Sequence, residues 1–260
     1  MKLEKQIAVV TGGGQGLGRV ICMKLAEAGA TVIIADINPE TSAETAELIK
    51  KNFNRESLVV VTDLRKEAAV ANLADTVRQQ FGSLDILINN SGIAGPRSRL
   101  EDVSLEEWNE SLAINITGLF LTCKYLAPLL KAKKRSTIVN IASTGGMRPL
   151  VMRMPYTTTK GAVIAFTKGL ALEYGADGVR VVSICPGAFD GPRQDNVLRK
   201  VAEQSGRPFD DVVKEKKAEA VLNTFITPES IGDAVLFLCS SEGSFITGTN
   251  LNISAGLVLG

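Results

Sequence analysis

Short runs of β-branched and aliphatic residues alternate with longer segments of helical periodicity along the chain. A first strand is predicted at residues 7–11 (IAVVT), directly before a glycine-rich turn and a helix at 16–28. Further strands are predicted at 31–36, 58–63, 84–90, 137–143, 179–187 and 249–254. Helices are predicted from Pro39, at 66–81, in two stretches of 104–133, and up to residue 174 around Tyr156.

The early strands are almost continuously apolar, which is typical of parallel strands that helices cover on both faces. Regular alternation of strand and helix predicts an α/β fold, a doubly wound parallel sheet of seven strands. No linker or repeat divides the chain, so we expect one domain over residues 1–260. The charged insertion at about 188–227 follows the sixth strand, and we expect it to form a lid over the carboxyl edge of the sheet, where ligands bind in such folds.

Composition excludes several classes of function. Of 260 residues, 45% are apolar and the net charge is +1, which gives no support for a nucleic-acid or membrane partner. The absence of histidine rules out a Ser-His-Asp hydrolase, a Cys-His protease and a His-ligated metal site, and we expect no metal. The four cysteines are far apart, there is no signal-peptide pattern, and no apolar stretch looks long enough to span a membrane, so we expect a cytoplasmic protein.

The first strand ends in TGGGQGLG, residues 11–18. A glycine turn between a strand and a helix lets backbone approach a pyrophosphate, and the helix N-terminus favours anions. The stretch matches TGxxxGxG, with Gly12, Gly16 and Gly18. Asp36 ends the second strand, where a carboxylate can bind ribose hydroxyls and would repel a 2′-phosphate. Its only other predicted role is to cap the next helix. Asp63 after the third strand could meet the adenine edge.

Tyr156 and Lys160 are four residues apart on one face of a predicted helix, and Ser143 ends the fifth strand. Together with NNSG at 89–92 and Asn115, this order and spacing resembles the short-chain dehydrogenase/reductase family over essentially the whole chain. The resemblance implies a Rossmann fold, NAD as cofactor, and Asn115, Ser143, Tyr156 and Lys160 as the catalytic residues. It implies cofactor contacts from Gly12, Gln15, Gly16, Leu17, Gly18, Asp36, Asp63, Leu64, Asn90, Gly92, Tyr156, Lys160, Pro186 and Gly187.

The mechanism that the resemblance implies is physically reasonable. A free tyrosine has a pKa of about 10, and a nearby ammonium favours its phenolate form. Tyr156 would therefore exchange the proton of the substrate, Lys160 would lower the pKa of Tyr156 and bind the nicotinamide ribose, and Ser143 would hold the substrate oxygen. Asn115 would hold a water that relays protons to Lys160. Asn89, Ser91 and Gly92 would support the fourth strand and the adenine-ribose side of the cofactor.

The chain departs from the family pattern after the sixth strand. Pro186 and Gly187 match, but Gly191 stands where the family has a threonine that contacts the nicotinamide carboxamide. Arg193 follows two residues later, and arginine is well shaped to bind a carboxylate or phosphate. We hypothesise that Arg193 binds an anionic or strongly polar substrate group or covers the cofactor pyrophosphate; the alternative is a solvated or capping arginine at the start of a lid helix.

Three functions remain open from the sequence. The first is an NAD-linked dehydrogenase or reductase of a small secondary alcohol or ketone. The second is an NADP-preferring carbonyl or 3-oxoacyl reductase, against which Asp36 argues. The third is a non-catalytic nucleotide-binding family member, against which the complete catalytic set argues. Apolar residues beyond one core stripe in the segments 118–130 and 157–172 indicate burial against a partner, and the resemblance implies that these helices pair, so we predict a homotetramer.

Overall fold

The computed structural model describes residues 2–259, apart from the side chains of Pro192 and Arg193. Its seven strands form one parallel sheet in the order β3-β2-β1-β4-β5-β6-β7. Strand order therefore runs outward from β1 in both directions, which is the doubly wound topology that the sequence predicted. The strands are β1 (Ile7–Thr11), β2 (Thr31–Asp36), β3 (Ser57–Val61), β4 (Ile86–Asn89), β5 (Ser136–Ile141), β6 (Val179–Pro186) and β7 (Asn250–Ile253).

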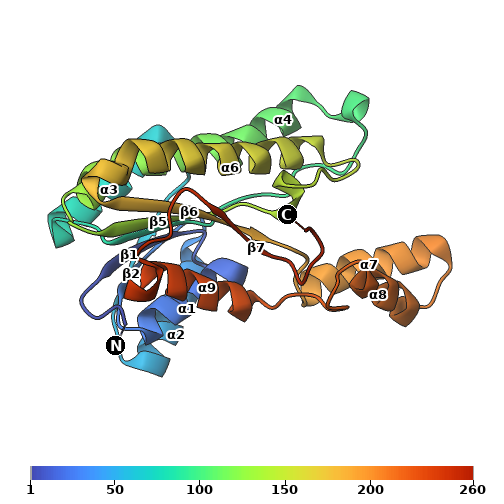
Figure 1. The fold of residues 1–260 in the computed structure, drawn as a ribbon, viewed down its shortest axis with the longest axis horizontal. Helices are drawn as coiled ribbons and strands as arrows, with labels where there is room; N and C mark the ends of the chain where they lie inside the picture. The colour runs from blue at the N-terminus through green and yellow to red at the C-terminus, as the bar shows by residue number, and fades with distance from the viewer. Residues whose placement is uncertain (1, 260) are drawn as a thin grey trace.

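Helices cover both faces of the sheet (Figure 1). One layer holds α1 (Gly16–Glu27), α2 (Pro39–Phe53) and α9 (Pro228–Cys239), and the other holds α3 (Glu67–Phe81), α4 (Leu105–Leu112), α5 (Gly118–Lys131) and α6 (Met154–Tyr174). Each layer packs on its own buried cluster. In β1, for example, Ala8 and Val10 face the first layer and Val9 faces the second. Both faces are covered, so the inner strands carry apolar residues at consecutive positions, as in Ala8, Val9 and Val10.

Two helices, α7 (Pro192–Ser205) and α8 (Phe209–Ala218), extend beyond the end of the sheet (Figure 1). They occupy the charged insertion after β6. Their buried residues Leu198, Ala202 and Val212 form a small cluster with Phe225, separate from the clusters under the sheet. Gly191 precedes α7 with φ 135°, a backbone conformation that essentially requires glycine. The turn into α7 therefore explains why glycine stands where the family has threonine.

Two sequence expectations need correction. Helix α9 was not predicted, although Ile231, Val235 and Leu238 recur with helical spacing and are buried. The segment Leu105–Lys131 is continuous helix, and by length and composition alone it is apolar enough to cross a membrane, contrary to the expectation from the sequence. Half of its apolar window is buried inside the fold, as in a core helix. Such a helix is weak evidence for a membrane span.

Candidate active site

The glycine turn after β1 is shaped for close approach of a ligand to backbone. Gly12 and Gly16 have positive φ of 64° and 53°. A Cβ on Gly18 would lie 1.8 Å from the carbonyl oxygen of Gly12, so only glycine fits where α1 crosses the turn. Asn90 holds the turn from the neighbouring strand, because its side-chain amide donates to the carbonyl oxygens of Thr11 (3.0 Å) and Gly12 (3.2 Å).

The N-terminus of α1 is open. Its N-cap residue, Gln15, makes no side-chain capping bond, and no atom lies within 4 Å of the Cβ position of Gly16. The backbone N–H groups of the first turn therefore have no capping side chain, and the positive end of the helix dipole faces the turn. This is the donor set that a pyrophosphate needs.

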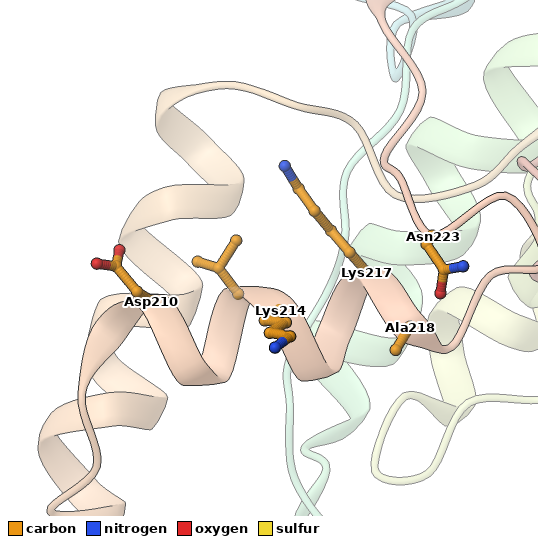
Figure 2. A pocket seen from close by; sticks show the side chains of 6 residues that line it. Asp210, Lys214, Lys217, Ala218 and Asn223 are labelled. Carbon is orange, nitrogen blue, oxygen red and sulfur yellow. The ribbon is translucent and has the colours of Figure 1, made fainter.

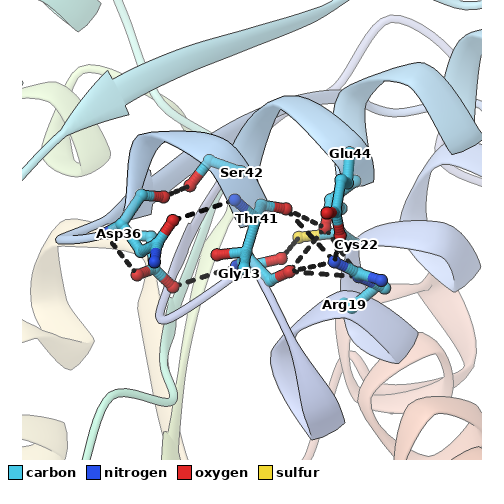
Figure 3. Close-up of polar contacts among 10 residues, drawn as sticks. Gly13, Arg19, Cys22, Asp36, Thr41, Ser42 and Glu44 are labelled. Carbon is cyan, nitrogen blue, oxygen red and sulfur yellow. Dashed lines mark hydrogen bonds and ion pairs between the residues drawn. The ribbon is translucent and has the colours of Figure 1, made fainter.

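Arg19 fixes the shape of this turn through hydrogen bonds to its backbone (Figure 3). Its guanidinium donates to the carbonyl oxygen of Gly14 through Nε (3.0 Å) and Nη2 (2.7 Å), and to the hydroxyl of Thr45 at 3.0 Å. Glu44 pairs with the same guanidinium at 2.8 Å. The guanidinium of Arg19 is thus engaged by the turn and by α2 and does not point toward the open N-terminus of α1.

Asp36 lies beside the turn at the end of β2. Its carboxylate accepts the backbone N–H of Gly14 through Oδ2 and that of Asn38 through Oδ1, both at 3.0 Å (Figure 3). Each carboxylate oxygen keeps a lone pair for a further donor. Ile37 next to it is 55% exposed and uncharged. A fixed carboxylate beside an open helix N-terminus fits the ribose and pyrophosphate of a dinucleotide.

Asp63 is engaged by its own loop. Arg65 donates to both carboxylate oxygens of Asp63 at 2.9 Å, and its backbone N–H adds a third bond at 3.1 Å. These hydrogen bonds from Arg65 hold the pKa of the Asp63 carboxyl below its ordinary value. Leu64 between them is buried against α5, where Gly118 leaves room for it. An adenine at this edge would meet an ion pair rather than a solitary carboxylate.

Tyr156 and Lys160 lie in the first two turns of α6. Lys160 is 5% exposed, and its ammonium donates to the carbonyl oxygen of Ile141 at the end of β5, at 2.8 Å. Burial lowers the pKa of Lys160 from 10.5 to about 8. The Nζ atom is 6.0 Å from the centre of the Tyr156 ring. The ammonium of Lys160 therefore lies next to the half-buried ring of Tyr156.

Ser143 follows β5 and faces the same region. It is 8% exposed, and its Oγ accepts the backbone N–H of Gly145 at 3.0 Å. The Cβ position of Gly145 lies 3.3 Å from Cε1 of Tyr156, so the Ser143 turn packs directly on the tyrosine ring. Ser143, Tyr156 and Lys160 therefore meet where β5 ends, as their spacing predicted.

Asn115 completes this group from the opposite side. It lies in a π-helical turn, Ala113–Thr117, between α4 and α5, and is 2% exposed. Its amide accepts from the backbone N–H of Ile93 (2.8 Å) and donates to the Ile93 carbonyl oxygen and the Thr159 hydroxyl (both 3.0 Å). A Cβ on Gly92 would lie 3.2 Å from Oδ1 of Asn115 and 3.3 Å from Nζ of Lys160. Residues 90–92 thus join the glycine turn to the catalytic group.

The turn after β6 borders the same edge. The hydroxyl of Thr144 donates to the carbonyl oxygen of Pro186 at 3.2 Å, and the N–H of Gly187 donates to Ile253 at 2.8 Å. A side chain on Gly187 would collide with Ser254, 2.9 Å away. The side chain of Arg193 lies outside the described residues, so the hypothesis about its ligand stays a prediction.

A separate hollow of about 350 Å³ lies along α8 and the segment after it (Figure 2). It is lined by Asp210, Val213, Lys214, Lys217, Ala218 and Asn223. In Figure 2 the side chain of Lys217 extends upward from the helix and that of Lys214 is seen nearly end-on. Lys217 lies over the Phe225 ring at 5.3 Å. The hollow contains none of the residues singled out from the sequence.

Some residues of the site were not foreseen from the sequence. Thr159 orients Asn115, Thr144 links the Ser143 turn to Pro186, Arg19 holds the glycine turn, and Arg65 occupies Asp63. The only local signal was for Arg19 and Arg65, which stand next to predicted cofactor residues. Nothing in the sequence indicated Thr159 or Thr144, because their partners are far away in the chain.

Comparison with known proteins agrees with this geometry. A family model described as enoyl-(acyl carrier protein) reductase matches residues 12–258. A 3-oxoacyl-[acyl-carrier-protein] reductase of Aquifex aeolicus is 32% identical over 257 residues, 99% of each chain. The L-sorbose reductase of Gluconobacter frateurii, solved with NADPH and L-sorbose, superimposes with a TM-score of 0.93 at 26% identity, covering 99% of each chain.

An NAD⁺-bound xylitol dehydrogenase superimposes with a TM-score of 0.91 at 28% identity, covering 98% of this chain and 100% of that one. The two structures differ in the cofactor that they contain, so the likeness supports a nicotinamide cofactor without choosing between its two forms. With a family model over nearly the whole chain and a relative at 32% identity, the protein belongs to the short-chain dehydrogenase/reductase family and is an oxidoreductase of that family.

Proposed function

We propose that this protein transfers a hydride between NAD(H) and a small secondary alcohol or its ketone. The observation that carries the proposal is the convergence of Ser143, Tyr156 and Lys160 at the end of β5, with Asn115 facing them across Gly92. The nicotinamide cofactor, when bound, supplies or accepts the hydride. The protein has to hold both reactants, move one proton and keep water from the reacting carbon.

Tyr156 exchanges the proton. Its hydroxyl serves as the acid or base for the substrate oxygen that Ser143 holds, and the buried ammonium of Lys160 lies 6.0 Å from the centre of its ring. The Ser143 hydroxyl accepts from the N–H of Gly145, which leaves its own hydrogen for the substrate oxygen. Asn115 and Lys160 both border Gly92, and a proton can pass by this route between Tyr156 and solvent. The helices α7 and α8 act as the lid over the substrate.

The turnover assay that tests this function uses a panel of secondary alcohols and ketones with NAD and NADP. Tyr156→Phe should lower the rate by about 10²- to 10⁴-fold, the usual cost of losing a general acid or base. Nucleotide titration of the same variant should give nearly unchanged affinity, because only the proton-transferring hydroxyl is lost. Near wild-type turnover by Tyr156→Phe contradicts the assignment.

Cofactor choice follows from Asp36. Its carboxylate is fixed by two backbone N–H groups at the end of β2, and a 2′-phosphate there would be repelled. We therefore expect higher kcat/KM with NAD than with NADP, and Asp36→Ala should shift the ratio toward NADP by roughly tenfold or more. Equal efficiency of the wild-type enzyme with NADP would instead favour the carbonyl or 3-oxoacyl reductase reading.

The proposal includes a homotetramer in the cytoplasm. The four cysteines are buried free thiols, which suits a reducing compartment. Exposed apolar side chains on α5 and α6 support association through these helices, and a prediction in the Discussion tests it.

A further inference from the structure

Residues 150–154, which comprise the end of the loop before α6 and the first residue of that helix and are here called the apolar loop, carry four exposed apolar side chains. Leu150 is 46% exposed, Val151 88%, Met152 42% and Met154 46%. Single exposed apolar residues are ordinary, but a contiguous group marks a binding surface. Two of the four are methionines, whose flexible side chains suit apolar ligands of varied shape.

The apolar loop adjoins the catalytic group directly. The Cβ position of Gly145 lies 3.1 Å from Cδ1 of Leu150 and 3.3 Å from Cε1 of Tyr156, so the two side chains border the same point. The backbone N–H of Leu150 also donates to the Thr157 hydroxyl in the first turn of α6, at 3.2 Å. A substrate held by Ser143 and Tyr156 must therefore pass or rest against this loop.

Arg153, the charged residue of the loop, forms hydrogen bonds within the fold. Its guanidinium donates to the carbonyl oxygens of Ala94 (3.4 Å) and Gly95 (3.2 Å), which ties the loop to the segment after β4. Met152 is held at φ 59°, a conformation that costs a residue other than glycine or asparagine about 1 kcal/mol or more. Strain of this kind is concentrated at ligand-binding sites.

The segment after α8 adds further apolar surface. It lies at the same end of the sheet as the loop before α6 (Figure 1). Val221 is 63% and Leu222 70% exposed. The backbone N–H of Leu222 donates to Ala255 at 3.0 Å, and Ser254 of the same tail packs on Gly187. Exposed apolar residues therefore stand on two separate segments beside the carboxyl edge.

We propose that the apolar loop is the specificity surface of the enzyme and selects apolar secondary alcohols and ketones over polyols and hydroxy acids. This inference rests on the proposed function and names its substrate class. Covering Leu150, Met152 and Met154 with a hydrocarbon ring or chain removes apolar surface from water, whereas a polyol there would lose hydrogen bonds to water without replacement.

The test compares substrates in matched pairs: cyclohexanol with a cyclohexane polyol, and 2-octanol with a short 3-hydroxy acid. Each is assayed with NAD and with NADP. One extra methylene in an apolar pocket changes kcat/KM by about 10- to 200-fold, so the wild-type enzyme should prefer the apolar member of each pair by at least about tenfold. The second pair also tests the anionic substrate hypothesised for Arg193.

Met152→Asn gives the sharper variant. Asparagine tolerates positive φ better than methionine, so the loop keeps its conformation and the protein its stability, while the apolar side chain is lost. We expect KM for the apolar members to rise by about five- to tenfold, with KM for the nicotinamide cofactor unchanged. Phe245→Asn is the control, because Phe245 is 99% exposed and lies before β7, at the opposite edge of the sheet.

Each outcome decides the matter. Preference for the polyol or the hydroxy acid overturns this inference and leaves the proposed function standing. An unchanged KM for the apolar substrates in Met152→Asn also overturns this inference alone. A change in the molar mass of Met152→Asn by light scattering does the same, because it would mean that a second copy of the chain covers the loop. No turnover of either member of any pair, with either cofactor, overturns the proposed function and this inference with it.

Discussion

Lys160 shows at the scale of a single residue how burial prepares a site for chemistry. Its ammonium is nearly inaccessible and has one carbonyl partner, Ile141. Desolvation lowers its pKa to about 8, so the folded state disfavours the charged form. A shift of this size corresponds to about 3 kcal/mol, at about 1.4 kcal/mol per pKa unit, and the site holds this destabilised cation beside Tyr156.

Replacing Lys160 by methionine should raise stability at neutral pH. The folded pKa is below the unfolded one, so the penalty is fully present below about pH 8 and disappears as pH rises toward 10.5. The Lys160→Met variant loses the bond to Ile141, worth about 1 kcal/mol, and gains more by removing the charge. Thermal unfolding at pH 7 and 9.5 measures the difference, which should shrink at the higher pH.

The matched control is Lys168→Met, since Lys168 is exposed on the same helix and should show no such pH dependence. A Lys160→Met protein that is less stable than wild type at both pH values would contradict the assigned burial penalty. Its turnover should fall in either case, because Tyr156 loses its neighbouring cation.

Gly18 tests the tight packing of the glycine turn. Gly18→Ala places a Cβ 1.8 Å from the carbonyl oxygen of Gly12, so α1 or the turn must move. We expect destabilisation of about 3 kcal/mol or more, with loss of nucleotide binding. Gly161→Ala is the control within α6: its nearest contact is 3.7 Å, and alanine there should stabilise the helix by about 0.5–1 kcal/mol. Chemical denaturation of both variants checks the pair.

At the scale of elements, a chain of buried hydrogen bonds joins β4 and β5 to α5, which follows the turn of Asn115, and to α6, which carries Tyr156 and Lys160. Thr122 of α5 donates to Asn89 (2.6 Å), Asn89 to Asn140 of β5 (2.9 Å), and Asn140 to Thr167 of α6 (2.9 Å). Thr122 lies two turns after Asn115, and Thr167 two turns after Lys160. The network therefore fixes both helices against the same pair of strands.

The lid helices should move independently of the sheet. Phe225 is 7% exposed and packs with Leu198 and Val212, in a cluster that is separate from the main core. Phe225→Ala should therefore speed hydrogen exchange in α7 and α8 and leave exchange in β1–β6 unchanged. We expect KM for the alcohol to rise by roughly tenfold while nucleotide affinity stays constant. Uniformly faster exchange across the sheet would show that the cluster belongs to the main core.

At the scale of the whole molecule, we predict a homotetramer with a mass four times the 27.7 kDa of the chain. Phe120 on α5 is 45% exposed and Leu172 on α6 is 87% exposed, although both helices are otherwise well packed. Phe120→Glu would bury a charge in such an interface and should lower the mass measured by light scattering. A wild-type monomer at working concentration, or an unchanged mass in this variant, would contradict the assignment.

The sequence by itself determined the fold class and most of the site. Strand alternation, continuous apolar runs and glycine turns are local properties, so β1 and β2 were predicted with their exact bounds. Tyr156, Lys160, Ser143 and Asn115 were singled out because their order and spacing resemble the short-chain dehydrogenase/reductase family, and ligands bind at the carboxyl edge of such a sheet. The structure places them together with distances that spacing alone could not give.

Tertiary structure decided what depends on partners far away in the chain. The depth of Lys160, the pairing of Asn115 with Thr159, and the hold of Asn90 on the glycine turn arise from contacts between separate elements. The exposure of residues 150–154 beside Tyr156 likewise cannot be predicted from the sequence, because a buried and an exposed apolar loop can have the same sequence pattern. Burial and the distances between side chains of separate elements arise only when the chain packs. They set the pKa of Lys160 and the surface that a substrate meets.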